Sequence, residues 1–230
     1  MDARKRFVDS TCLNINEIGR FKSFPGALEI LLSVLTILRY AFRPRFAREA
    51  TMKINVVGTS GVGKSTLARR LAQELSLPYI EMDVLYWLPE WQGTPDDEFY
   101  AKLAAALAAP GWVLDGNYNR SRPVKWRDVD LVVWVDYSFW RTMRQAIWRA
   151  ASRASRRQEL WPGTGNCETF RRSFFSRDSI ILWTLKTWRN NRRRYLADMQ
   201  DPQYRHIRFV RLRNQQQTEA LVRELRQNRR

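Results

Sequence analysis

From residue 53 onward, short apolar runs alternate with longer stretches in which apolar residues recur every three or four positions. The short runs predict five strands, at 53–57, 78–82, 111–115, 130–135 and 206–212. The longer stretches predict helices at 64–75, 95–108, 138–157, 168–176, 179–199 and 216–227. Buried strands separated by helices favour right-handed crossovers, so we expect an α/β domain with a five-stranded parallel sheet flanked by helices on both faces.

The most apolar stretch of the chain precedes this pattern, at residues 24–42. Glu29 and Arg39 leave only nine uncharged residues between them, whereas a helix that spans a bilayer needs about 20. We therefore expect no membrane-spanning helix here.

Two interpretations remain for residues 1–51. They are an N-terminal extension with an interfacial helix, or a segment upstream of the true start, because Met52 begins MKINVVGTSGVGKST directly at the first predicted strand. In either case we place the domain at 52–230. We favour the second interpretation and therefore expect no membrane contact from the extension.

The formal net charge is +17, and most of it lies near the C-terminus. Residues 141–230 carry 22 basic and 7 acidic groups, whereas residues 51–140 carry 9 and 11. Such an excess favours a polyanionic partner, namely nucleotide phosphates, nucleic acid or an acidic membrane surface. The same arginines could equally form a solvated helical surface.

Cysteine usage indicates the compartment. Cys12 and Cys167 lie far apart, and neither belongs to a pair with the spacing of metal ligands or lies near the single histidine, His206. Neither a zinc site nor a disulfide framework is indicated, so we expect a cytoplasmic protein.

Residues 58–66, GTSGVGKST, match the phosphate-loop pattern G-x-x-x-x-G-K-[ST] between a predicted strand and a predicted helix. Glycines let backbone N–H groups turn inward, and the helix N-terminus adds a positive end, so a polyphosphate fits there. We expect Lys64 to reach the β- and γ-phosphates and the Ser65 hydroxyl to ligate Mg²⁺. The residues expected to bind ATP are Gly58, Thr59, Ser60, Gly61, Val62, Gly63, Lys64, Ser65 and Thr66.

Three predicted strands end in a carboxylate, at Asp83, Asp115 and Asp136. Open α/β sheets bind ligands at the carboxyl ends of their strands, so each carboxylate is a candidate to hold Mg²⁺ through its waters. Each could instead cap the following helix. Asp83 is also our candidate to orient or deprotonate an acceptor hydroxyl.

The segment GWVLDGNYNR resembles the GFLLDGFPR segment of adenylate kinases, in which an Asp closes the third strand and an Arg beyond it contacts the acceptor's phosphate. Arg120 lies one residue further from Asp115 than the adenylate kinase Arg does. The resemblance implies that Asp115 belongs to the magnesium site and that Arg120 lies on the acceptor side.

Residues 52–225 more closely resemble a bacterial group of small P-loop kinase-like proteins, related to adenylate kinase and often labelled DNA topology modulation proteins. The shared segments are MKINVVGTSGVGKST, MDVLYWLPEW, WVLDGNYNR, VDYSFW with the arginine-bearing helix after it, NCETF and WRNNRRRYL. The resemblance implies the sheet order of nucleotide kinases and places Asp83, Tyr86 and Trp87 on the acceptor side. In the helix after VDYSFW it leaves open which arginine faces the phosphates, among Arg141, Arg144 and Arg149.

Residues 149–177 lie between the fourth and fifth predicted strands, where nucleotide kinases carry a mobile lid whose arginines close on the phosphates. The segment is rich in arginine, and WPGTG at 161–165 suits a hinge or loop tip. We expect an Arg-rich lid here. Arg149 and Arg153 are its candidate catalytic residues, beside Lys64 and Asp83.

Trp183 and Trp188 lie among arginines, which would suit stacking and backbone contacts with a nucleic-acid strand. They also share helical spacing with apolar residues, which indicates packing in a core beneath the lid.

Two functions are therefore open. The first is Mg-ATP-dependent phosphoryl transfer to a small acceptor, such as a nucleoside or nucleotide, by a P-loop kinase with ATP and Mg as cofactors. The alternative is an ATP-binding protein that associates with nucleic acid through its basic C-terminal half, although no helix-turn-helix, zinc-finger or RRM pattern accompanies the charge.

Overall fold

The computed structural model describes residues 51–156, 159–167, 169 and 179–228, without the side chains of residues 180, 181 and 183. The predictions for the N-terminal extension and for the side chain of Trp183 lie outside this range. So does nearly all of the helix predicted at 168–176.

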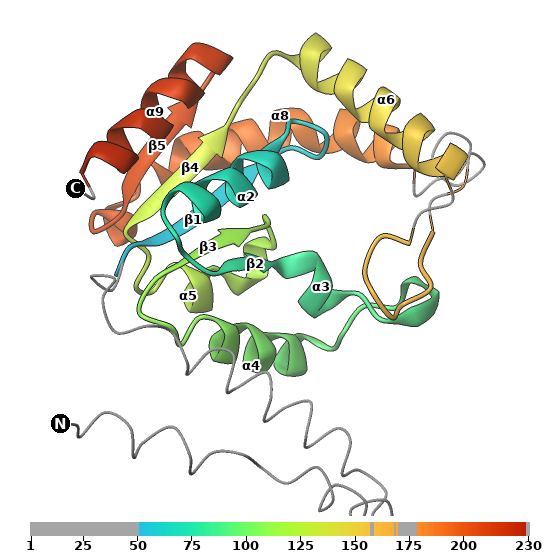
Figure 1. The fold of residues 1–230 in the computed structure, drawn as a ribbon, viewed down its shortest axis with the longest axis horizontal. Helices are drawn as coiled ribbons and strands as arrows, with labels where there is room; N and C mark the ends of the chain where they lie inside the picture. Colours follow the sequence, from blue (N-terminus) through green and yellow to red (C-terminus); the bar gives the residue numbers. More distant parts are fainter. Residues whose placement is uncertain (1–50, 157–158, 168, 170–178, 229–230) are drawn as a thin grey trace, which may run out of the picture. The chain divides into compact units, whose positions relative to one another are not determined.

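A five-stranded parallel sheet runs through the described part of the chain (Figure 1). Its strands are β1 (Lys53–Gly58), β2 (Tyr79–Glu81), β3 (Trp112–Asp115), β4 (Leu131–Val135) and β5 (Arg208–Leu212). Their order across the sheet is β2-β3-β1-β4-β5, and every neighbouring pair is parallel. All five predicted strands are confirmed, and their carboxyl ends lie along one edge of the sheet.

Five of the predicted helices are present: α2 (Lys64–Glu74), α4 (Asp96–Ala106), α6 (Phe139–Arg156), α8 (Ile180–Asp198) and α9 (Gln215–Gln227). Shorter elements that the sequence analysis missed are α3 (Met82–Tyr86), α5 (Arg122–Lys125), η2 (Pro89–Trp91), η3 (Asn119–Ser121) and η4 (Pro202–Tyr204). No helix in the described ranges is long and apolar enough to span a bilayer.

Helices cover both faces of the sheet. Successive strand residues point to opposite sides, so a continuous apolar strand presents apolar side chains on both faces, and the helices bury them. Val56 belongs to one buried cluster, with α2 and α9, whereas Val57 belongs to the other, with α4, α8 and the segment around Trp126. Every residue of β4 is buried, as expected for a strand with helices on both sides. The helix α6 packs beside α8 and extends past the end of the phosphate loop (Figure 1).

Candidate active site

The phosphate loop connects β1 to α2. Gly61 and Gly63 have φ values of 86° and 96°, in the left-handed region that favours glycine. A Cβ at Gly61 would lie 2.7 Å from the Cβ of Ala146 on α6, so no side chain fits there. No described side chain caps the first turn of α2, which leaves its N–H groups for a ligand. Close backbone approach and uncapped N–H groups together form a cradle for an anion.

Lys64 and Asp115 meet beside this loop. The Nζ atom of Lys64 lies 3.7 Å from Oδ1 of Asp115, and the two side chains are 15% and 3% exposed. The Asp115 Oδ1 atom is buried and has no hydrogen-bond partner among the described groups, whereas Oδ2 accepts a bond of 3.1 Å from the Tyr79 hydroxyl. Burial, with the charges of Asp115 and Glu81, raises the pKa of Tyr79, so its hydroxyl stays a donor.

An orphaned carboxylate oxygen beside the loop fits a site for hydrated Mg²⁺, whose waters need such acceptors. Ser65, the second residue of α2, is half-buried next to Lys64 and could supply its hydroxyl as a ligand. The structure thus brings together the residues predicted for ATP and for Mg²⁺.

Asn117 holds the start of the loop, and the sequence analysis missed it. Its Nδ2 donates to the carbonyl of Gly58 at 2.7 Å, and its Oδ1 accepts from the N–H of Gly58 at 3.0 Å. Oδ1 also accepts from the hydroxyl of Tyr195 on α8 at 3.1 Å. The buried amine of Lys125 donates to the carbonyl of Asn117. The only feature of the sequence that could have pointed to Asn117 is its place two residues after Asp115.

Asp83 and Tyr86 lie on α3, at the end of β2. Oδ1 of Asp83 accepts a hydrogen bond of 2.7 Å from the hydroxyl of Tyr118, whose ring centroid lies 4.9 Å from that of Tyr86. Burial and the charge of Asp83 raise the pKa of Tyr118, which keeps the hydroxyl protonated. The bond fixes the orientation of the Asp83 carboxylate.

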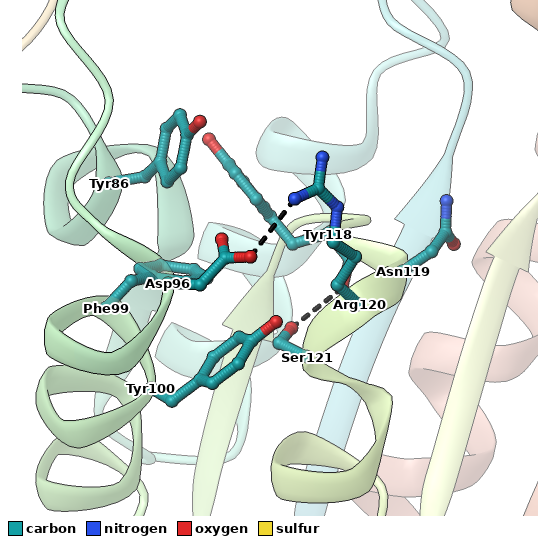
Figure 2. A pocket seen from close by; sticks show the side chains of 8 residues that line it. All are labelled: Tyr86, Asp96, Phe99, Tyr100, Tyr118, Asn119, Arg120 and Ser121. Carbon is teal, nitrogen blue, oxygen red and sulfur yellow. Dashed lines mark hydrogen bonds and ion pairs between the residues drawn. The ribbon is translucent and has the colours of Figure 1, made fainter.

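Next to this pair is a cavity of about 110 Å³, shown in Figure 2. Arg120 lines it and pairs with Asp96 at 3.0 Å. The full lining is Tyr86, Asp96, Phe99, Tyr100, Tyr118, Asn119, Arg120 and Ser121. Tyr86 and Arg120 therefore share one pocket, whereas Trp87 does not line it.

Of the three arginines that the sequence analysis considered for contact with the phosphates, Arg149 contacts the phosphate loop. It donates to the hydroxyl of Ser60 at 3.0 Å. Arg141 lies over the ring of Tyr137, 4.2 Å from its centroid, and Arg144 is exposed. Arg153 follows Arg149 by one helical turn on α6 and is half-buried.

The described tip of the predicted lid, residues 159–167, packs on the turn that follows Trp87. Trp161 stacks on Trp87, with ring centroids 5.6 Å apart and planes at 15°. Asn166 donates to the carbonyl of Leu88 at 2.9 Å and accepts from the N–H of Trp91 at 3.0 Å. Trp87 thus contacts this segment rather than the pocket.

Asp136 occupies a different setting from the one that a magnesium ligand requires. Its Oδ2 accepts from Nε of Arg211 at 2.8 Å, and Nε of Arg192 lies 3.4 Å away. Two cations therefore already neutralise this carboxylate. Trp188 is half-buried, edge-on to Phe139, so it belongs to the packing of α8 against α6.

Sheet order, loop and site together define a P-loop NTPase fold of the nucleotide-kinase kind. Residues 54–110 match the model of the ATPase family associated with various cellular activities (AAA). That span runs from β1 through α4 and contains the phosphate loop.

Among solved structures, the chain is similar to a gluconokinase from Sinorhizobium meliloti 1021. The two are 18% identical, with a TM-score of 0.42, and the match covers 79% of this chain and 97% of the gluconokinase. No curated protein sequence matches the chain.

Proposed function

We propose that the protein is a Mg-ATP-dependent kinase that transfers the γ-phosphoryl group to a hydroxyl of a small molecule. One observation carries the proposal: the phosphate loop, the Lys64–Asp115 pair and the Asp83–Tyr118 pair follow adjacent strands β1, β3 and β2. Donor and acceptor residues thus lie side by side at one edge of the sheet, where such sheets bind their ligands.

In this mechanism the loop would bind the phosphates, and Ser65 and Asp115 would hold Mg²⁺, which would supply charge neutralisation at the transferring group. Lys64 and Arg149 are positioned to stabilise negative charge that develops there. Asp83 orients the acceptor hydroxyl and accepts its proton as the new P–O bond forms and the bond to ADP breaks.

The test uses the full chain with Mg-ATP and pools of nucleosides, nucleotides and sugars, and it measures ADP formation. We expect acceptor-dependent ADP that disappears in Lys64→Ala. The matched control is Lys186→Ala, which removes an exposed lysine of α8. ADP formation that no acceptor stimulates, or that survives in Lys64→Ala, would contradict the proposal.

The motifs that resemble the DNA topology modulation group also support an assignment to that group, as a further part of the proposal. Cytoplasmic localisation remains an expectation from cysteine usage.

A nucleic-acid partner is a second candidate, favoured by one feature of α6. Trp140 and Trp148 are 80% and 73% exposed, and Arg144 lies between them on the same side of the helix. Exposed rings and a cation at this spacing could stack bases and contact phosphate. Binding of single-stranded DNA that weakens steeply with salt and is lost in Trp140→Ala, Trp148→Ala would support it. Salt-independent binding, or none, would contradict it.

A further inference from the structure

The acceptor side of the domain is acidic, in a chain that is otherwise strongly basic. Residues 78–101 contain six carboxylates and neither Lys nor Arg, although the whole chain has a net charge of +17. This stretch comprises β2, α3, η2 and the acidic first turn of α4. It also supplies Asp83 and half of the pocket lining, including Asp96. The pocket thus differs in charge from the phosphate loop beside it.

The cation at the pocket is neutralised by a neighbour. Arg120 is the one Lys or Arg among the described lining residues, and its guanidinium lies 3.0 Å from the Asp96 carboxylate (Figure 2). The two side chains of this pair are 83% and 50% exposed, so an anionic acceptor that approached Arg120 would share the guanidinium with Asp96 and meet a solvent-screened carboxylate beside it. Binding of such an acceptor is therefore opposed.

Other arginines near the site are paired mainly with groups outside the pocket, although Arg122 also donates a long bond of 3.5 Å to the Asn119 side chain on the pocket wall. Arg122 forms a two-bond pair with Asp198 on α8, at 2.9 and 2.6 Å. Arg69 pairs with Glu81 at 2.8 Å, and Arg149 contacts the phosphate loop through Ser60.

The walls of the pocket are largely aromatic. Tyr86, Phe99 and Tyr118 form one cluster of rings, with centroids between 4.9 and 5.3 Å apart. Ring faces favour the carbon skeleton of a sugar or base and also attract a cation. Aromatic walls with a carboxylate rim favour neutral or cationic ligands over anions.

We infer that the acceptor is a hydroxyl-bearing molecule without negative charge, such as a polyol, sugar, amino sugar or nucleoside, and that phosphorylated and carboxylate-bearing acceptors are disfavoured. The inference rests on the proposed function and narrows it. The reaction that consumes the product would accordingly act on a phosphate monoester formed from an uncharged or cationic alcohol.

The experiment compares acceptors in pairs that differ by one anionic group and keep the same terminal CH2OH hydroxyl: adenosine and 3′-AMP, thymidine and 3′-TMP, sorbitol and gluconate, glucosamine and glucosamine 1-phosphate. Two quantities are measured for each, kcat/KM for ADP formation and the dissociation constant from calorimetry. For the preferred scaffold we expect the uncharged or cationic member to be favoured by about threefold, the scale of one solvent-screened charge near the site.

A charge variant tests whether Asp96 causes this preference. Asp96→Asn leaves Arg120 without its carboxylate, so the preference should disappear. The matched control is Asp128→Asn, which changes net charge equally at an exposed carboxylate paired with Arg127 outside the pocket. The control should keep the wild-type preference.

Each outcome decides between the possibilities. A kcat/KM for 3′-AMP, 3′-TMP, gluconate or glucosamine 1-phosphate that equals or exceeds that of its uncharged or cationic partner overturns the inference and leaves the kinase proposal standing. An equal loss of preference in both variants also overturns the assignment to Asp96. If ADP forms with no acceptor, the kinase proposal fails, and the dissociation constants then decide the inference. Tighter binding of the anionic members, or no binding at all at millimolar concentration, overturns it.

Discussion

The substitution Asn117→Ala tests how the phosphate loop is held. The Asn117 amide satisfies both the N–H and the carbonyl of Gly58, at 3.0 and 2.7 Å. Gly58 is buried, so alanine would leave two backbone groups without their partner. Each buried unpaired polar group costs about 1–3 kcal/mol, so the free energy of unfolding should fall by about 2–5 kcal/mol.

The assay is urea unfolding followed by circular dichroism, together with a thermal melt. For a domain of this size, 1 kcal/mol corresponds to about 2–4 °C, so Asn117→Ala should melt about 5–15 °C below the wild type. Tyr195→Phe is the matched control, because it removes the bond of 3.1 Å to Asn117 and keeps both bonds to Gly58. It should cost only about 1 kcal/mol. If Asn117→Ala costs no more than Tyr195→Phe, water replaces the amide and our reasoning is wrong.

Three further substitutions test other parts of the site. Gly61→Ala places a Cβ 2.7 Å from the Cβ of Ala146, on a residue whose φ is 86°. Binding of a fluorescent ATP analogue should be lost while the circular dichroism spectrum is kept. Retained binding would contradict the assignment of this loop as the phosphate-binding site. Trp161→Ala removes the stack on Trp87, so limited proteolysis within the lid tip should become faster, and an unchanged rate would show that the stack does not hold it. Burial lowers the pKa of Lys125 well below its ordinary 10.5, so the unfolded chain binds a proton that the folded protein lacks. Between the lowered folded-state pKa and about 10.5, the contribution of Lys125 to stability should rise with pH, so Lys125→Met should flatten urea-derived stabilities as pH approaches 10.5; equal slopes would contradict this.

Strands and long helices were predictable because their signals are local. The residues of β4 form a continuous apolar run, and α2 repeats its buried positions at helical spacing. The helices α3 and α5 have five and four residues, too few for a periodic pattern, and were missed. Their presence depends on packing against distant parts of the sheet.

In the candidate site, too, local features were predictable and contacts between distant residues were not. The phosphate loop is contiguous, so spacing alone identified Lys64 and Ser65. Asn117 bonds to Gly58 across 59 residues of sequence, and Asn166 reaches Leu88 across 78. Pairs at such separations leave no local pattern, and only the folded chain shows them. The resemblance to adenylate kinases drew attention to Arg120 but gave no indication that Asp96 would be its ion-pair partner.

The phosphate loop and the neighbouring pocket differ in charge, and this difference would affect which substrate of the proposed kinase binds at each. In the proposed kinase, Lys64 in the loop and Arg149 on α6 would attract the polyphosphate of ATP. The neighbouring pocket offers one cation, Arg120, and that cation is paired with Asp96. An uncharged acceptor would be selected by shape, aromatic contact and hydrogen bonds. A phosphorylated acceptor would need a second cluster of cations, and residues 78–101 contribute none. For the proposed kinase, this charge pattern would favour ATP at the loop and an uncharged acceptor at the pocket, and so distinguish the two substrates.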